Sequence, residues 1–193
     1  MRLFIALPLT QQAKQKLSDI LSELRQYGGK VKWVNPEIIH LTVRFLGDTD
    51  ENVVGDLGDL LDKIASDYEP IETTIDSLGG FPNLKQPRVI WAGLADGPPV
   101  ESCAELTEKV EQAVRYFGFL PDNKRFRPHL TLGRVKGSKG LSNLLDQIID
   151  YRLDPIPLTL DRICLFKSTL TPRGPIYECL HEAKLGKQDR LEG

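Results

Sequence analysis

The alternation of apolar and polar residues along the chain predicts a mixture of strands and helices. A period of two residues indicates half-buried strands, and apolar residues that recur every three or four positions indicate amphipathic helices. The predicted strands cover residues 2–8, 31–34, 38–46, 71–77, 88–94, 128–135, 157–166 and 175–183, with a weak extended piece near 124–126. The predicted helices cover residues 11–26, 51–65, 100–117 and 141–150. This set of elements predicts the α+β class.

The order of these elements repeats once along the chain. Residues 1–78 and 88–167 each read strand, helix, strand, strand, helix, strand, which is the ferredoxin-like order. We therefore expect two pseudo-symmetric ferredoxin-like lobes whose antiparallel sheets face a central groove, within one bilobal domain over 1–185. A closing strand near 175–183 is expected to extend one sheet, and residues 186–193 are expected to form a flexible tail.

One short phrase occurs in a predicted strand of each repeat. Residues 40–43 read His-Leu-Thr-Val, and residues 129–132 read His-Leu-Thr-Leu. In a strand, the histidine and threonine of each phrase point to one face while the apolar residues point to the other. Two such faces brought together would form a pocket with two imidazoles and two hydroxyls, which suits acid–base chemistry on a phosphate.

This pairing alone also allows a plainer interpretation, in which both histidines lie at the edge of the core in ordinary strands. The flanking residues favour the functional interpretation. The third histidine, His181, lacks a threonine partner and is expected to be structural or exposed. Trp33 and Tyr177 could stack on a base, but packing in the core or at its edge is the expected role of each.

Charge and composition narrow the class of protein. The net charge is −2, yet residues 124–139 carry only basic charges. We expect Lys136 and Lys139 to be solvated in a Gly/Ser loop, whereas Arg127 precedes the second histidine by two residues and can share its pocket. A basic strip at such a pocket favours an anionic polynucleotide end. Arg44, on the histidine face of its strand, is a second candidate for neutralising phosphate charge.

The remaining composition indicates a cytoplasmic protein. No apolar run approaches the length of a membrane span, and no signal peptide is recognised. Cys103, Cys164 and Cys179 have neither disulfide nor metal-site spacing, so buried thiols in a reducing compartment are expected. No cluster of carboxylates, histidines and cysteines has metal-ligand spacing, so no metal or other cofactor is predicted. We also expect a monomer without an obligate protein partner.

The two phrases and their flanks resemble the signature motifs of the 2H phosphoesterases, in particular the RNA 2′,3′-cyclic phosphodiesterases that are also called 2′-5′ RNA ligases. The matching segments are 1–7 (MRLFIAL), 32–47 (KWVNPEIIHLTVRFLG), 79–82 (GGFP), 88–94 (RVIWAGL), 126–134 (FRPHLTLGR), 167–170 (KSTL) and 174–177 (GPIY). The resemblance therefore runs in order from residue 1 to about residue 183.

The resemblance implies a metal-independent hydrolase that opens a terminal 2′,3′-cyclic phosphate of RNA, such as that on a tRNA fragment, to a 2′-phosphomonoester. It implies that His40 protonates the leaving oxygen and that His129 deprotonates the nucleophile; the symmetry of the motifs alone cannot assign these roles. Thr42 and Thr131 would hold the phosphate oxygens. Arg134 is a further phosphate-binding candidate beside Arg127 and Arg44.

Three alternatives remain open at this point. A related 2H enzyme could act on another cyclic phosphate, such as that of a nucleotide or of ADP-ribose. A ferredoxin-like lobe could also serve as a non-catalytic RNA-binding module, although retention of both histidines disfavours this. A metal-dependent phosphodiesterase is disfavoured because the required carboxylate ligands are missing.

Overall fold

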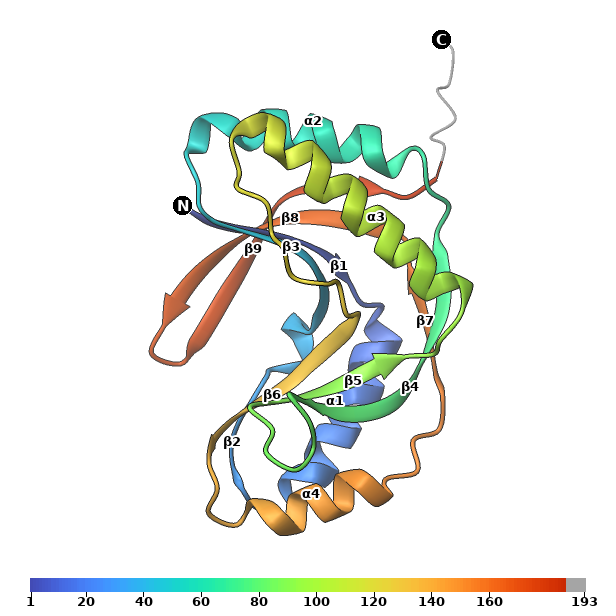
Figure 1. The fold of residues 1–193 in the computed structure, drawn as a ribbon, viewed down its shortest axis with the longest axis vertical. Coiled ribbons are helices and arrows are strands. Elements are labelled where there is room, and N and C mark those ends of the chain that lie inside the picture. The colour runs from blue at the N-terminus through green and yellow to red at the C-terminus, as the bar shows by residue number, and fades with distance from the viewer. Residues whose placement is uncertain (187–193) are drawn as a thin grey trace.

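One antiparallel sheet curls through the part of the chain that the computed structural model describes, residues 1–186 (Figure 1). The nine strands within those residues are β1 (Arg2–Pro8), β2 (Lys30–Trp33), β3 (His40–Asp48), β4 (Ile71–Phe81), β5 (Val89–Leu94), β6 (His129–Gly137), β7 (Ile156–Leu160), β8 (Arg162–Thr171) and β9 (Gly174–Lys184). The helices are α1 (Gln11–Arg25), α2 (Val54–Ala65), α3 (Pro98–Val114) and α4 (Leu141–Asp150), with short 3₁₀ turns η1 (Pro36–Ile38), η2 (Glu51–Val53) and η3 (Arg115–Phe117). The predicted α+β class is confirmed.

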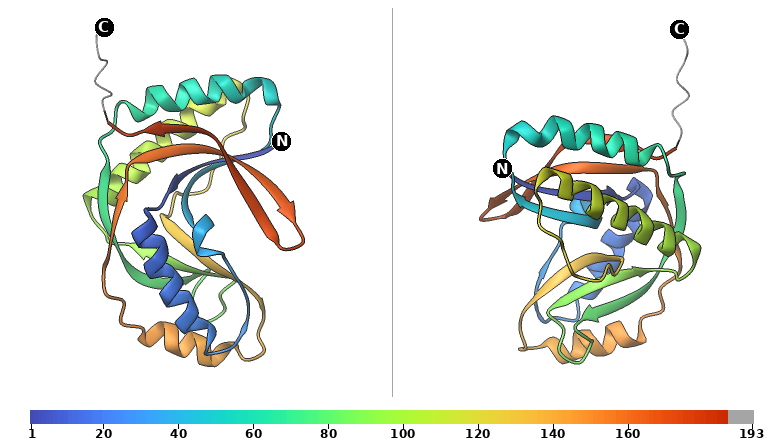
Figure 2. Two further views of the ribbon diagram at one scale, coloured as in Figure 1. Left: turned by 180° about the vertical axis from the view of Figure 1, so that it is seen from behind. Right: turned by 45° about the horizontal axis from the view of Figure 1, so that its top comes forward.

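The strand order across the sheet is β7-β4-β5-β6-β3-β1-β8-β9, with β2 paired to β6. Helices α2 and α3 lie together at one end of the curl, and α1 and α4 lie at the other (Figures 1 and 2). Each end of the sheet takes strands from both sequence repeats, because β4 lies between β7 and β5 at one end and β1 lies between β3 and β8 at the other. The repeat therefore describes the order of elements along the chain. In space, neither end of the sheet is built from one repeat alone.

Helix α1 illustrates how the predicted helices form and dock. The Thr10 hydroxyl oxygen accepts a hydrogen bond from the Ala13 backbone N–H at 3.3 Å and so caps the first turn. Ala13, Leu17 and Leu21 lie on one stripe and are fully buried in the core. The predicted boundaries of this helix agree with the structure to within one residue.

The predicted strand over 157–166 is wrong in one respect, because it is two strands that separate at Asp161. β7 pairs with β4, whereas β8 pairs with β1 at the far end of the sheet order. At this break, the Arg162 side chain donates a hydrogen bond to the Asp161 carboxylate. The sequence pattern does not show the break, because the apolar run of β8 follows the alternating residues of β7 after only Asp161 and Arg162. The two strands are distinguished by their pairing partners.

Two other local predictions differ from the structure. The predicted extended piece near 124–126 is a loop. Strand β4 continues to Phe81, beyond the predicted end at residue 77, and includes Gly79 and Gly80. The Trp91 ring lies against the backbone there, since a Cβ at Gly79 would be 2.2 Å from the ring. Glycine is used here for close approach rather than for a turn.

The β8–β9 hairpin projects beyond the rest of the sheet (Figure 2). Apart from Gly186, the tail predicted at 186–193 lies outside the described residues. Within residues 1–186, no helix has the length and apolar character needed to span a membrane.

Candidate active site

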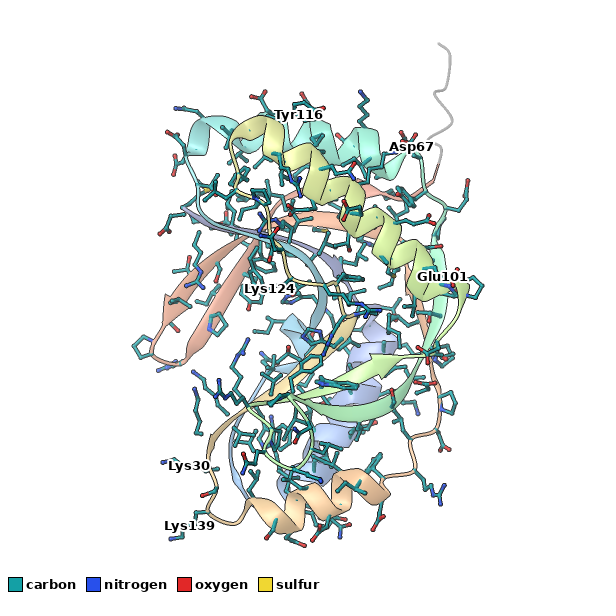
Figure 3. The ribbon with its side chains drawn as sticks, viewed as in Figure 1. Lys30, Asp67, Glu101, Tyr116, Lys124 and Lys139 are labelled. Atoms are coloured by element: carbon teal, nitrogen blue, oxygen red, sulfur yellow. The ribbon has the colours of Figure 1, made fainter. Side chains whose placement is uncertain are left out.

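The two His-x-Thr strands meet at the centre of the sheet. Leu41 of β3 lies opposite Leu130 of β6, and both are buried. The flanking histidines and threonines consequently line one groove of about 1440 Å³. Side chains crowd this opening between the two ends of the sheet, beneath the loop that carries Lys124 (Figure 3).

Both histidines are anchored in the same way. The Nδ1–H of His40 donates to the Ile38 carbonyl oxygen at 2.8 Å, and the Nδ1–H of His129 donates to the Arg127 carbonyl oxygen at 2.6 Å. A carbonyl oxygen can only accept, so Nδ1 must carry the proton and Nε2 is the atom that exchanges one. Each strand thus presents an oriented acid–base group to the groove.

The two imidazoles have different surroundings. His40 packs against Phe4, with ring centroids 4.9 Å apart, and meets Tyr177 edge-on at 5.5 Å. His129 instead meets the edge of Phe81 at 4.8 Å. Aromatic packing fixes both ring planes. Tyr177 is half-buried, which agrees with its expected place at the edge of the core. It also lines the groove beside His40.

Burial lowers the pKa of His40 below its ordinary value of 6.5. The hydrogen bond to the Ile38 carbonyl opposes this shift, whereas the charge of protonated His129 adds to it. His40 is therefore biased toward the neutral form while the groove holds no anion. A bound phosphate would favour the protonated form by placing negative charge beside the ring.

Arg44 lies in the groove wall, but its guanidinium is already engaged. Its Nε is 2.5 Å from Oε2 of Glu111 and its Nη1 is 3.7 Å from Asp122. It also donates to the carbonyl oxygens of Phe45 at 2.7 Å and Leu120 at 2.5 Å. These contacts favour a positioning role for Arg44, which ties β3 to the loop leading into the second motif.

Glu111 is the residue that sequence reasoning missed. It is only 6% exposed, and its Oε1 accepts hydrogen bonds from Arg115 and from the backbone N–H of Asp122. A buried carboxylate requires such partners, because removal from water strongly disfavours an unpaired charge. The available signal was a carboxylate adjoining the buried stripe of α3 at Val110 and Val114.

The remaining arginine candidates lie on the groove without forming a pair in the described structure. Arg127 and Arg134 are exposed and line it. Burial raises the pKa of Tyr177, and the positive charges of Arg134 and Arg2 oppose that rise, which places both cations near the His40 end. Arg127 precedes β6 rather than lying within it, and its backbone carbonyl orients His129.

The basic residues of 124–139 do not all lie on the groove. Lys136 is exposed as expected but also borders the groove, whereas Lys139 is exposed outside it, near Lys30 (Figure 3). The groove cations that form no salt bridge within residues 1–186 come from several elements: Arg2, Arg25, Lys32, Lys124, Arg125, Arg127, Arg134, Lys136 and Arg173. This concentration of positive charge suits a polyanionic ligand.

The third histidine takes no part in the groove. His181 Nε2 is 3.0 Å from Asp62 Oδ1 on α2, which agrees with its expected structural role. Within residues 1–186, no group of three or more histidine, cysteine, aspartate or glutamate side chains is arranged to hold a metal ion.

Comparison with known proteins assigns the family. The model of the 2′-5′ RNA ligase superfamily matches residues 10–171. The chain is 33% identical over 184 residues to the RNA 2′,3′-cyclic phosphodiesterase of Thermotoga maritima, covering 95% of each chain. It is 36% identical over 183 residues to the Methanocaldococcus jannaschii protein of that name, covering 94% of this chain and 99% of the relative.

Solved structures share the fold. The Thermus thermophilus protein TT0787 matches with a TM-score of 0.75 and 28% identity, covering 97% of this chain and all of that one (100%). Escherichia coli LigT complexed with 3′-AMP matches with a TM-score of 0.75 and 21% identity, covering 95% and 97%, and supports the fold alone. The chain belongs to the 2′-5′ RNA ligase superfamily.

Proposed function

We propose that this protein is an RNA 2′,3′-cyclic phosphodiesterase that hydrolyses a terminal 2′,3′-cyclic phosphate to a 2′-phosphomonoester. The observation that carries the proposal is the paired anchoring of His40 and His129, which leaves two Nε2 atoms free at one basic groove. The names of the relatives point to the same reaction. Imidazoles titrate near neutrality, so one can accept a proton while the other donates one.

In the proposed reaction, a water oxygen attacks phosphorus while its proton passes to Nε2 of His129. The P–O3′ bond breaks, and O3′ takes the proton from Nε2 of His40. The phosphate remains on O2′, and the ribose regains a 3′-hydroxyl. Thr42 and Thr131 donate hydrogen bonds to the non-bridging oxygens, and Arg127 and Arg134 neutralise their charge. The negative charge of the substrate offsets the lowered pKa of His40 and allows it to act as the acid.

The same geometry accounts for a joining reaction. If the 5′-hydroxyl of a second RNA replaces water, attack at phosphorus with departure of O3′ forms a 2′-5′ phosphodiester. Both reactions use the same two proton transfers. Hydrolysis should dominate in dilute RNA because water is abundant and the joined product can be cleaved again.

We further propose that the enzyme works as a cytoplasmic monomer without an obligate protein partner. The thiols of Cys103 and Cys164 are free and buried as expected, whereas that of Cys179 is free but exposed, so the expected burial is wrong for Cys179. Free thiols are typical of a reducing compartment. Size-exclusion chromatography with light scattering would test whether the protein is a monomer, since a dimer would have twice the mass of the chain.

The decisive experiment incubates EDTA-treated protein with a short RNA that ends in a 2′,3′-cyclic phosphate and separates the 2′- from the 3′-phosphate product. We expect conversion to the 2′-phosphate, undiminished by the chelator. Formation of the 3′-phosphate would overturn the assignment of O3′ as the leaving atom. Tight RNA binding without conversion would instead favour a different cyclic phosphate or a binding module.

A further inference from the structure

The outer part of the groove carries exposed apolar side chains that the proposed chemistry does not use. Six large apolar residues are exposed among residues 1–186, and three of them, Phe45, Leu170 and Ile176, line this groove. Isolated exposed apolar residues are ordinary, but their concentration beside a functional site indicates a binding surface. Phe45 is 57% exposed, and the other two belong to the projecting β8–β9 hairpin.

A β-bulge places Phe45 on this surface. Strict alternation from His40 would turn residue 45 toward the core, as it does Leu41 and Val43. The pairing of β1 with β3 shifts, however, so that Ala6 faces Thr42 while Phe4 faces Phe45. Phe45 therefore lies beside Phe4, at a ring separation of 5.9 Å, on the histidine side of the sheet. Bulges often re-aim side chains next to active sites in this way.

The rings form a short row that leads away from the reaction centre. The Phe4 ring lies between His40, at 4.9 Å, and Phe45, at 5.9 Å, and Phe4 itself is only 2% exposed. Phe45 is thus the outermost ring of the row and the one with an accessible surface. Its inner side is held by packing, which makes it a rigid platform for another planar group.

Two cations line the groove that contains this platform. Arg173 lies in the turn of the β8–β9 hairpin, and Arg2 begins β1; both border the same groove. An exposed aromatic ring on a sheet, flanked by cations, is the arrangement with which proteins hold single-stranded nucleic acid: bases stack on the ring, and the cations follow the phosphates. A paired duplex could not present a base face to Phe45.

The position of Phe45 indicates which nucleotide it would hold. A cyclic phosphate between the two histidines keeps its own ribose and base close to them. The Phe45 ring lies at most about 11 Å from the His40 ring, with the Phe4 ring between them, whereas the Tyr177 ring is only 5.5 Å from His40. The terminal nucleotide therefore has Tyr177 as the nearer aromatic ring of the groove, which leaves Phe45 to the neighbouring nucleotide.

We propose that the groove binds a single-stranded RNA end of at least two nucleotides, with the base of the penultimate nucleotide stacked on Phe45 and the RNA backbone held by Arg2 and Arg173. The proposal rests on the proposed function for the position of the terminal phosphate. It makes Phe45 a determinant of the preference for oligonucleotides over nucleoside 2′,3′-cyclic phosphates.

The test compares kcat/KM for adenosine 2′,3′-cyclic phosphate with that for a tetranucleotide ending in the same group. Loss of one stacked base typically costs several-fold to about a hundredfold in affinity, so the wild type should prefer the tetranucleotide by about tenfold or more. Phe45→Ala and Phe45→Leu should bring this ratio toward one through KM, whereas Phe45→Trp should retain it. Tyr116→Ala, an exposed aromatic residue outside the groove, serves as the matched control and should leave the ratio unchanged.

Equal kcat/KM for the two substrates in the wild type would overturn the proposal, as would full retention of the preference in Phe45→Leu. Hydrolysis of neither substrate would contradict the proposed function instead. Fluorescence anisotropy separates the two failures: a 3′-phosphorylated tetranucleotide is bound to a His40→Ala/His129→Ala variant with and without Phe45→Ala. About tenfold weaker binding with Phe45→Ala supports the stacking proposal, and unchanged binding overturns it, whatever the activity.

Discussion

Leu41 lies opposite Leu130 at the junction of β3 with β6, and this contact brings the two His-x-Thr motifs together. Each leucine stands between the histidine and the threonine of its motif and is at most 1% exposed. The core contact and the groove are therefore opposite faces of the same two strands. Alternation turns the leucines inward and the functional groups outward.

Replacement of either motif histidine should abolish most activity. We expect His40→Ala and His129→Ala each to lower the rate on a cyclic-phosphate RNA by about 10²–10⁴-fold, the usual contribution of a positioned acid or base. Single-turnover kinetics measures the loss, and thermal denaturation checks that each variant folds. His181→Asn, which changes the histidine paired with Asp62, should keep the wild-type rate. Wild-type rates in either motif variant would refute the mechanism.

The pKa of His40 should depend on the charge of His129. The pKa of His40 in the free protein should lie below 6.5, and His129→Asn should raise it by removing a positive charge that lowers it. Inorganic phosphate should raise it as well, because an anion stabilises the imidazolium. Proton NMR of the ring Cε1–H resonances follows these midpoints. A His40 midpoint above 6.5 in the free protein would contradict the effect of burial.

The lowered pKa of His40 also has a consequence for folding. Because the unfolded chain binds this proton more readily, the contribution of His40 to stability is complete above pH 6.5 and declines as the pH falls toward the folded pKa. Urea unfolding at a series of pH values should show this acid decline, and His40→Gln should make it shallower. If the free energy of unfolding falls as steeply with pH in His40→Gln as in the wild type, other groups cause the decline.

Loss of the Glu111 carboxylate should destabilise the fold and impair the site together. Glu111→Ala leaves Arg44 without its buried partner, and breaking a buried ion pair from one side typically costs about 3–5 kcal/mol. Urea denaturation would measure this loss. Glu105→Ala, at an exposed position of the same helix, is the control and should have little effect on stability. A Glu111→Ala protein as stable as the control would show that the pair does not hold the loop.

Gly79→Ala should destabilise the protein although glycine is normally unfavourable in a strand. The added Cβ would lie 2.2 Å from the Trp91 ring, so the indole or the β4 backbone must move. Overpacking of this kind costs about 1–3 kcal/mol. Thermal denaturation should show a lower Tm, and Gly55→Ala, where the Cβ meets nothing within 4 Å, is the matched control. An unchanged Tm would mean that the indole shifts without cost.

Local pattern was sufficient to predict the helices, most strands and the shared groove of the four motif residues. Their signals lie within a few residues: the apolar stripe of α1, the alternation through β3 and β6, and the repeated His-x-Thr phrase. Such short-range preferences carry information about element type and about which side chains share a face. The ion-pair partner of Arg44 could not be predicted in this way, because Glu111 lies on α3, far from Arg44 in the sequence.

Tertiary structure decided what depends on pairing between distant segments. It divided 157–166 into strands at different places in the sheet, turned Phe45 to the histidine side through a bulge against β1, and brought Tyr177 beside His40. Strand partners and register are set by contacts far apart in the chain, which local periodicity does not encode. The sequence by itself thus determined which residues could do the chemistry, and the fold determined their surroundings.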